Sequence, residues 1–520
     1  MKKLLITVAA LAFSLVCLFG ADLIVRLYLN ANADKAKYYN NIYTRNCSDY
    51  AMERIIDDHS IVVLGSSELY SEDDLAYPSA LFNGGYSDFN LVLMGGGYLQ
   101  SLSQAINVGA LANNIKNGKV VLIVSPQWFT AEGLSADAFS SRFEEPNYIE
   151  FLKNKDISAE TKTAVSDRVN ALLTADTAAL KRVKQYEDIY LRHTLNLFSY
   201  VKTLPYNAFQ NAKIRFKLAR EYKDLDSLNT DRYVRVEEID FDALVKQAEE
   251  TGRADCTTND FGIFDEYYDE YIRGALDSMK NANENVSYAV SPEYDDLKLF
   301  LRVCRETGIE PLIISVPVNG RWYDYTGFSI ADRNTYYQNI RNICAENQVS
   351  LVDFSEKEYE LFFLKDIMHM GWKGWAYLDR AVYSFYKNEE IKNTTSYRDL
   401  INDGNVALSD GTTAAGERGY TFLTDAGSNG FNGFYVYLEQ DRTFLDVSNA
   451  VGNRSGVYLH TRPSGQYTVR FQANGNRLDE YVDVDVYLEE NAVYRVAYSI
   501  DQFSEGQIQI GGVGFAKVEY

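Results

Sequence analysis

The sequence predicts an α/β protein with a doubly wound, five-stranded parallel sheet, followed by an all-β domain. Short apolar runs alternate with helical patterns up to about residue 392, and one long helical stretch interrupts them. Beyond residue 393, apolar and polar residues alternate and glycines become frequent. The first pattern is typical of strand–helix–strand units, and the second of antiparallel sheets. A chain of 520 residues is long enough for both domains to have cores of their own.

The five expected strands of the parallel sheet are short apolar runs that end in turn-forming residues. Strands covered by helices on both faces read as continuous apolar runs, because neither face meets water. The runs are Ile61–Leu64, Leu91–Met94, Val120–Val124, Pro311–Val316 and Ser350–Phe354. The helices expected beside the later strands are Tyr294–Thr307, Thr335–Asn347 and Trp372–Lys387. A helical insertion of about 130–290 separates the third and fourth strands, and the whole α/β domain spans 28–392.

The last part of the chain, 393–520, is expected to form an accessory β-sandwich. No lysine occurs between Lys392 and Lys517, and turn signals such as Asn-Gly separate the alternating runs. The segment holds one histidine and no cysteine, so it lacks the usual nucleophile and metal ligands. We expect it to serve recognition or spacing. Its expected strands are Gly433–Leu438, Gly456–Leu459, Tyr467–Phe471, Tyr481–Leu488, Val493–Ile500 and Gln507–Ile510.

The N-terminus reads as a membrane anchor over residues 1–27. Two lysines precede an uncharged stretch, 4–20, and about 20 apolar residues are enough to cross a bilayer as a helix. A cleaved signal peptide is the alternative, but its apolar core is usually shorter and no clear small-x-small cleavage site follows. The lysines favour a cytoplasmic N-terminus. We therefore expect a single-pass protein with most of its chain outside the cell membrane.

Composition and charge exclude several function classes. The net charge is −22 and no basic stripe is present, so nucleic acid is not an expected partner. The cysteines have no C-x-x-C spacing, which argues against a zinc ribbon or a redox motif. Cys304 and Cys344 are expected as buried thiols in two helices, although a location outside the cell permits disulfides. No His, Asp or Glu cluster has metal-ligand spacing, and we expect neither a metal nor another cofactor.

Serine acyl chemistry is the reaction that the remaining polar residues favour. Ser67 follows the first apolar run in a Gly-Ser-Ser turn, at the strand end where ligands bind in open α/β sheets. A serine hydroxyl needs a base to take its proton, and the base needs a carboxylate to orient it. His369 follows the last strand, and Asp366 precedes it by three residues. Ser67, His369 and Asp366 are therefore the candidate nucleophile, base and orienting acid. The alternative is a purely structural role for Ser67, as the N-cap of a helix.

Two further strand ends offer hydrogen-bond donors for a developing oxyanion. The second strand ends in Gly95-Gly96-Gly97, and the third in Ser125-Pro126-Gln127-Trp128-Phe129. Gly97 offers a backbone N–H that no side chain obstructs, and Gln127 a side-chain amide. The alternative for the glycine run is an ordinary turn. A phosphate-binding loop is not expected, because no Gly-Lys-Ser/Thr follows.

These segments, in this order, resemble the block pattern of the SGNH-type (GDSL-like) serine hydrolases. Gly-Ser-Ser stands where that pattern has Gly-Asp-Ser, and Gln127 where it has asparagine. Both departures fit a narrower resemblance to the DltD family, which covers roughly residues 1–390 and leaves the β domain outside. The segments that carry it are Gly65–Leu69, Ser125–Phe129, Asn259–Ile263, Pro317–Gly327 and Asp366–Trp375.

The resemblance implies D-alanyl transfer onto lipoteichoic acid, outside the cytoplasmic membrane of a Gram-positive type envelope. A membrane-bound O-acyltransferase would deliver the D-alanyl group, Ser67 would hold it as an ester, and lipoteichoic acid would accept it. No cofactor is implied, because the acyl group arrives activated. The same family segments supply four candidate substrate-binding residues: Trp128, Asn319, Trp322 and Tyr323.

Two alternatives stay open from the sequence. A membrane-anchored esterase or O-acetyltransferase that acts on a cell-wall glycan would use the same three residues. A non-catalytic protein that binds an envelope polymer through its β domain would have Ser67 and His369 out of hydrogen-bond reach. The acyl group, the acceptor, the ligand of the β domain and the oligomeric state leave no readable signature.

Overall fold

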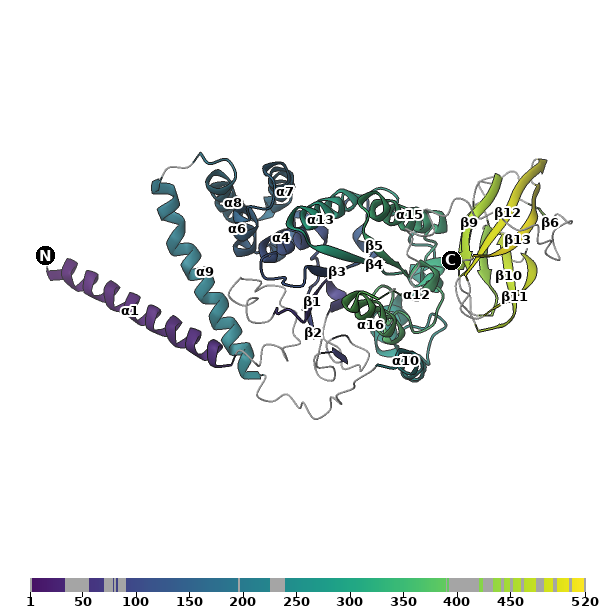
Figure 1. Cartoon of the computed structure of the whole chain (residues 1–520), viewed down its shortest axis with the longest axis horizontal. Helices are drawn as coiled ribbons and strands as arrows, with labels where there is room; N and C mark the ends of the chain where they lie inside the picture. Colours follow the sequence, from purple (N-terminus) through teal and green to yellow (C-terminus); the bar gives the residue numbers. More distant parts are fainter. Residues whose placement is uncertain are drawn as a thin grey trace. The chain divides into compact units, whose positions relative to one another are not determined.

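A computed structural model describes most of the α/β part of the chain and the strands of the C-terminal part (Figure 1). The described residues are 2–32, 56–69, 78, 81–82, 90–194, 197–224, 239–389, 391, 420–423, 434–440, 444–448, 452–459, 463–473, 481–489, 493–504 and 507–518. The chain groups into two compact units. The first comprises Met1–Val124, Glu132–Phe241 and Pro292–Leu312, and the second Ser125–Ala131, Asp242–Ser291 and Ile313–Tyr520.

The central sheet has five strands, as predicted, in the order β2-β1-β3-β4-β5. The paired strands β1, β2 and β3 run parallel, and Leu64 at the end of β1 lies opposite Met94 and Leu122. The order reverses after β2, which is the arrangement of doubly wound folds. Every residue of β1 and β3 is buried, because their apolar runs are covered on both faces. The strands are β1 (Ser60–Leu64), β2 (Asn90–Met94), β3 (Lys119–Val124), β4 (Glu310–Ser315) and β5 (Ser350–Asp353).

Helices of the first unit pack beside the first three strands. The helix α4 (Ser101–Leu111) connects β2 to β3 and packs against α13 (Glu293–Thr307), which precedes β4. At the start of α4 the buried Glu293 accepts a 2.8 Å hydrogen bond from the Ser101 N–H, one of the donors that a helix leaves open at its N-terminus.

The helical insertion follows β3, as predicted. It contains α5 (Ala136–Arg142), α6 (Glu145–Lys153), α7 (Ala159–Leu172), η4 (Leu173–Ala175), α8 (Thr177–Tyr190), α9 (Leu197–Asp224) and α10 (Phe241–Asp255).

Helices of the second unit frame the later strands. The predicted helix Trp372–Lys387 is present with the same bounds, as α16, and α15 (Ile330–Asn347) begins earlier than predicted. Cys304 in α13 and Cys344 in α15 are buried free thiols, as expected. The shorter elements are η2 (Ser67–Leu69), η3 (Pro126–Trp128), α11 (Asp265–Tyr267), η7 (Tyr268–Ile272), η8 (Arg273–Ala275), α12 (Leu276–Met279), α14 (Gly320–Tyr325) and η9 (Ser355–Lys357).

The described C-terminal strands form two antiparallel sheets of four strands each. One sheet has the order β11-β10-β7-β8 and the other β6-β13-β12-β9. The all-β prediction is therefore confirmed for this part, and the packing of the sheets into a sandwich stays a prediction. The domain boundary near 392 lies outside the described residues. The strands are β6 (Tyr420–Leu423), β7 (Phe434–Leu438), β8 (Phe444–Ser448), β9 (Gly452–Leu459), β10 (Gly465–Ala473), β11 (Tyr481–Leu488), β12 (Val493–Ser504) and β13 (Gln507–Val518).

The N-terminal segment is one helix, α1 (Lys2–Ala31), which packs against α9. Over the residues that the structure describes, no helix is long and apolar enough to cross a bilayer. The prediction of a spanning anchor over 1–27 is therefore not supported. Asp22 accepts a hydrogen bond from Arg26 and forms an ion pair with Arg215 of α9. The predicted anchor segment therefore contains charged side chains that are paired within the protein.

Candidate active site

The turn after β1 separates two neighbouring serines. Ser66 is buried, and its hydroxyl donates to the carbonyl of Gly96 at the end of β2, at 3.2 Å. Ser67 begins η2 and is half-exposed. A side chain at Gly95 would place its Cβ 2.9 Å from the Ser66 carbonyl oxygen, so only glycine lets the two strand ends approach this closely. The fold thus commits the Ser66 hydroxyl to the interior and leaves the Ser67 side chain accessible.

A chain of buried amides supports this turn from behind. Asn147 of α6 donates to Asn107 of α4 at 2.7 Å, and Asn107 donates to Gln104 at 3.0 Å. Gln104 then donates to the Gly65 carbonyl at 2.6 Å. All three amides are buried, where an unpaired polar group costs about 1–3 kcal/mol. This chain of amides therefore fixes the position of Gly65, two residues before Ser67.

Beside this turn, the end of β2 lies close to an arginine. Gly97 is half-exposed between the buried Gly96 and the exposed Tyr98. A Cβ on Gly97 would lie 3.6 Å from Nη2 of Arg142, an ordinary contact distance. A larger residue at position 97 would therefore cause no steric clash. The loop of Gly97 passes beside the guanidinium group of Arg142, the last residue of α5. Arg142 therefore brings positive charge to the loop of Gly97 after β2.

Gln127 sits in the middle of the turn η3 after β3. The Trp128 and Phe129 N–H groups donate back to the Ser125 and Pro126 carbonyls at 3.0 Å, which closes the turn. Trp128 and Phe129 are buried, and Gln127 between Pro126 and Trp128 is half-exposed. Three strand ends thus share one pattern: the residue singled out in the sequence is accessible and its neighbours toward the strand are buried.

Asp366 and His369 form the contact that their spacing predicted. The Asp366 Oδ2 atom lies 2.7 Å from Nδ1 of His369. The other oxygen, Oδ1, accepts from the backbone N–H groups of Met368 and His369, both at 2.8 Å. Asp366 is buried, and the His369 side chain is 28% exposed. The carboxylate therefore orients the imidazole ring through its Nδ1 atom.

The loop that carries this pair is closed on itself. The Lys365 N–H donates to the His369 carbonyl at 2.9 Å, and Leu364 pairs with Met370 as an antiparallel bridge. At Gly371 a Cβ would come within 2.6 Å of the Lys365 backbone nitrogen, so a larger residue would push the two arms of the loop apart. The sequence Asp-Ile-Met-His-Met-Gly thus builds a rigid hairpin-like loop with the imidazole at its tip.

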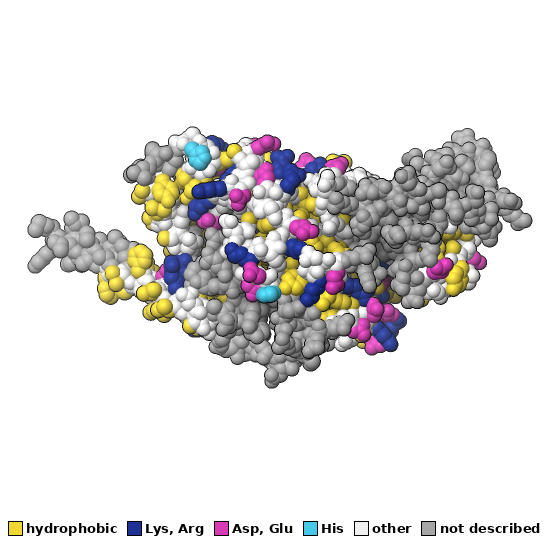
Figure 2. Space-filling model, viewed as in Figure 1, with side chains coloured by type: hydrophobic (Ala, Val, Ile, Leu, Met, Phe, Trp, Pro, Cys, Tyr) yellow, Lys and Arg dark blue, Asp and Glu magenta, His cyan; other side chains and the backbone are white. Residues whose placement is uncertain are grey.

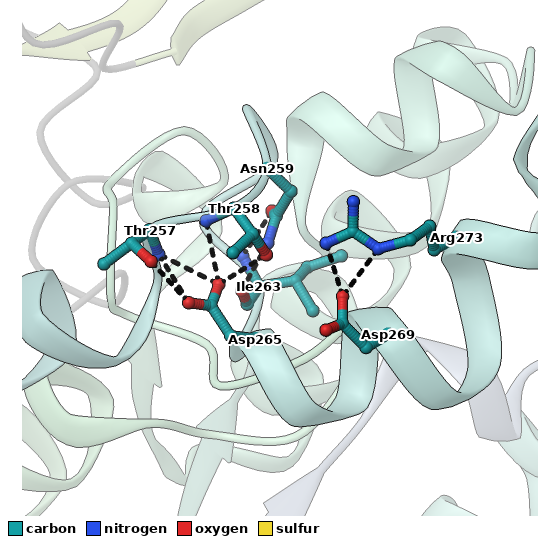
Figure 3. A network of polar contacts seen from close by, with 7 residues as sticks. All are labelled: Thr257, Thr258, Asn259, Ile263, Asp265, Asp269 and Arg273. Carbon is teal, nitrogen blue, oxygen red and sulfur yellow. Dashed lines mark hydrogen bonds and ion pairs between the residues drawn. The ribbon is translucent and has the colours of Figure 1, made fainter.

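The segment 257–273 holds a network of polar contacts (Figure 3) and is hydrogen-bonded to the loop of Asp366. Asp265 accepts hydrogen bonds from both backbone N–H groups and both hydroxyls of Thr257 and Thr258. Asn259 closes the next turn by donating to the Ile263 carbonyl at 2.7 Å. The segment then reaches the loop of Asp366, because the Phe264 N–H donates to the Lys365 carbonyl at 2.8 Å. The family segment Asn259–Ile263 therefore has a structural explanation.

Tyr267, in this same segment, responds to the charge of Asp366. Burial and the neighbouring Asp366 carboxylate raise the pKa of the Tyr267 phenol to about 12. A tyrosine phenol is neutral at physiological pH, and the raised pKa extends to higher pH the range in which Tyr267 keeps its proton as a hydrogen-bond donor. Within the described residues, no group of three or more His, Cys, Asp or Glu side chains could hold a metal ion.

The four residues proposed for substrate binding are all buried. Asn319 caps α14 by accepting from the Trp322 N–H, and donates to the Phe261 carbonyl, both at 3.1 Å. Trp322 packs edge-on against Phe261, with ring centroids 5.3 Å apart. Tyr323 shares a 3.0 Å hydrogen bond with the Tyr288 hydroxyl. Together with Trp128 in η3, they have structural contacts, and a role in substrate binding stays a prediction.

Three residues of the site were not found from the sequence. Gln104 and Arg142 lie on helices and reach the strand ends only through the fold, so no local pattern marks them. Tyr267 is one of 40 tyrosines, too common a residue to stand out. The weak available signal for Gln104 was a polar amide on a largely apolar helix between two buried strands.

Comparison with known proteins gives one consistent family. The model of the DltD protein family matches residues 39–387. Protein DltD of Bacillus subtilis (strain 168) is 31% identical over 353 residues, which is 66% of this chain and 87% of the relative. Protein DltD of Staphylococcus aureus (strain NCTC 8325 / PS 47) is 28% identical over 63% of this chain and 81% of the relative. Protein DltD of Lacticaseibacillus rhamnosus is 26% identical over 64% and 78%. The chain belongs to the DltD family.

Proposed function

We propose that this chain is a serine acyltransferase that transfers D-alanyl groups onto teichoic acid at the outer face of the cytoplasmic membrane. Membership of the DltD family supports D-alanylation as the process. The accessible Ser67 beside the buried Ser66, and the Asp366–His369 pair, support serine as the acyl carrier. The parallel strand order supports their meeting, since the carboxyl ends of parallel strands lie along one edge.

In the first half of the reaction, the Ser67 oxygen attacks the carbonyl carbon of the incoming D-alanyl ester. His369 Nε2 takes the hydroxyl proton as the new C–O bond forms, and Asp366 stabilises the resulting imidazolium through Nδ1. The imidazolium then gives that proton to the departing donor oxygen or sulfur. The products are the D-alanyl ester of Ser67 and the free donor, with no change in oxidation state.

In the second half, a hydroxyl of the teichoic acid acceptor attacks the Ser67 ester. His369 takes the acceptor proton and returns it to the Ser67 oxygen, which restores the enzyme. In both halves the negative charge on the carbonyl oxygen needs donors, and we assign the Gly97 N–H and the Gln127 amide to it. Arg142, beside Gly97, supplies positive charge for a phosphate of the anionic acceptor.

The acyl group needs no cofactor at this site, because it arrives already activated. Its proposed source is a membrane-bound O-acyltransferase, and the proposed acceptor is lipoteichoic acid. Both partners are at the membrane, so we place the chain at the outer face of the cytoplasmic membrane, in a Gram-positive type envelope.

The observation that carries the proposal is the different exposure of the two serines, and a pair of variants tests it. Ser67→Ala should lower turnover of a model acyl ester by about 10³-fold or more, as the loss of a nucleophile does in other triads. Ser66→Ala removes only a buried hydrogen bond and should keep turnover within a few-fold at a stability cost of about 1 kcal/mol. D-alanine ester content of cells that carry each variant gives the physiological readout. Normal turnover and normal D-alanylation with Ser67→Ala would refute the proposal.

A further inference from the structure

Outside the candidate site, α9 presents an apolar stripe beside basic side chains. Val201, Phe209 and Phe216 are 50%, 63% and 44% exposed. They are spaced by eight and seven residues, which offsets them by about 80° and about 20° around the helix axis, so all three lie within one sector of the helix surface. Lys213 and Arg220, also exposed, are seven residues apart and form a line beside that sector.

The opposite side of α9 is fastened to the first unit, which fixes the stripe outward. The Tyr206 hydroxyl donates to Glu145 of α6 at 3.3 Å, and the Tyr186 hydroxyl of α8 donates to Asn207 at 2.9 Å. Arg215 pairs with Asp22 of α1 at 2.7 Å, with only 8% of the Arg215 side chain exposed. These contacts hold α9 with Phe209 and Phe216 on its exposed side.

The apolar surface continues from α9 onto α1, which packs against it. Figure 2 shows hydrophobic side chains on the surface where Figure 1 draws α1 and α9, with Lys and Arg side chains nearby. Among the side chains of α1 that the structure describes, the exposed large apolar ones are Phe13, Val16, Leu18, Phe19, Leu23, Ile24 and Leu27. The two helices together expose more apolar area than isolated surface residues of a folded domain usually do.

The charge of α9 is opposite to that of the chain. Its sequence holds six Lys or Arg residues and two acidic ones, in a chain with a net charge of −22. An apolar stripe flanked by basic residues is the pattern of helices that lie in the plane of a bilayer surface, with lysines and arginines at the lipid phosphates. We propose that α9 lies on an anionic lipid surface, with Val201, Phe209 and Phe216 below the headgroups. This inference is independent of the proposed catalytic role.

A fluorescent probe on single cysteines in the full chain tests the placement. The background is Cys17→Ser/Cys47→Ser/Cys256→Ser, since Cys256 is partly exposed whereas Cys304 and Cys344 are buried. An environment-sensitive dye is attached at Phe209→Cys or Phe216→Cys. Asn211→Cys is the matched control, because it lies about 200° around the helix from Phe209 and lines the hollow of about 200 Å³ between α9 and α6.

The labelled chains are placed in nanodiscs of phosphatidylglycerol and phosphatidylcholine, with or without doxyl-labelled lipid. We expect blue-shifted emission and quenching by the doxyl lipid at positions 209 and 216, and neither at 211. Lys213→Glu/Arg220→Glu should weaken the quenching at 209 by about tenfold. Equal behaviour at 209 and 211 would overturn the proposal. A blue shift without doxyl quenching would overturn it as well, because it would mean that a protein, such as a second copy of this chain, covers the stripe.

Discussion

Two adjacent serines follow β1, and their surroundings give them different chemistry. The Ser66 hydroxyl is used in holding β1 to β2, whereas Ser67 begins a short turn and stays accessible. Asp366 and His369 show the same division of labour, since the acid is buried and the imidazole reaches outward. The spacing of Asp366 and His369 could be read from the sequence, because three residues fit one tight turn. The contribution of Arg142 could not, because a helix 45 residues after Gly97 brings it there.

At this scale the tautomer of His369 can be tested with Asp366→Asn. The amide oxygen of asparagine can still accept from the Met368 and His369 N–H groups, so the loop should keep its shape. Its NH₂ group would face Nδ1, however, and favour the wrong imidazole tautomer. We expect roughly 10³–10⁴-fold lower turnover of the model ester with an unchanged unfolding midpoint. Asp176→Asn, at a remote helix cap, is the matched control. Turnover within a few-fold of wild type would exclude Asp366 as the orienting acid.

The guanidinium beside Gly97 gives a second residue-scale prediction. If Arg142 meets a phosphate of the acceptor, Arg142→Gln should raise KM for a glycerol-phosphate oligomer about tenfold and leave hydrolysis of a neutral ester unchanged. Arg142→Lys should recover part of the affinity, because the charge returns without the bidentate geometry. Arg305→Gln, on the exposed side of α13, is the control. An equal loss with neutral and anionic acceptors would assign Arg142 a structural role instead.

At the scale of elements, the strands of the parallel sheet could be predicted to within two residues. Their apolar runs are continuous and end in glycine, serine or proline, so both the period and the stops are visible. The strands β6 and β8 were not among the predicted strands. The series of amide hydrogen bonds from Asn147 to Gly65 could not be predicted either, because it joins two helices to a turn and so depends on how they pack.

An ion-pair cluster frames the loop of Asp366 and predicts an acid-sensitive stability. Glu360 lies 2.6 Å from the Lys373 ammonium at the start of α16 and 2.8 Å from that of Lys357 in η9. Although burial opposes ionisation, the two lysines lower the pKa of Glu360 to about 2. A carboxylate with a lowered pKa stabilises the fold above its unfolded pKa of about 4.3 and loses that contribution as the pH falls toward 2.

Glu360→Gln should therefore lower the free energy of unfolding by about 2–3 kcal/mol at pH 7. The difference from wild type should shrink between about pH 4.5 and pH 2, as the wild-type carboxyl takes up its proton. Urea unfolding at a series of pH values measures it, with the exposed Glu310→Gln as control. A difference that does not change with pH would contradict the assigned charge state.

At the scale of the whole molecule, the family match ends at residue 387, close to the domain boundary predicted near 392. The elements that carry Ser67, Gly97, Gln127, Asp366 and His369 all precede that point. The described strands beyond it form antiparallel sheets, a different architecture from the parallel sheet. The change of composition in the sequence was therefore a sound guide to the change of architecture.

Truncation after Lys392 should leave a folded chain with model-ester turnover near that of the full-length protein. Attachment to envelope polymer, measured by sedimentation with isolated cell walls, should fall if the β domain serves recognition. Unchanged sedimentation would favour the spacer role. A folded truncated chain without ester turnover would show instead that the β domain completes the active site.

The central claim is that Ser67 carries the acyl group, and the mass of the trapped protein tests it most directly. The full chain is incubated with an activated D-alanyl ester and no acceptor, quenched in acid, digested and analysed by mass spectrometry. The account predicts one added alanyl group on the peptide that contains Ser67, which disappears when a glycerol-phosphate acceptor is supplied and never forms in Ser67→Ala. A D-alanyl group found on Ser66 or on another residue, or transfer to the acceptor that persists in Ser67→Ala, would contradict it.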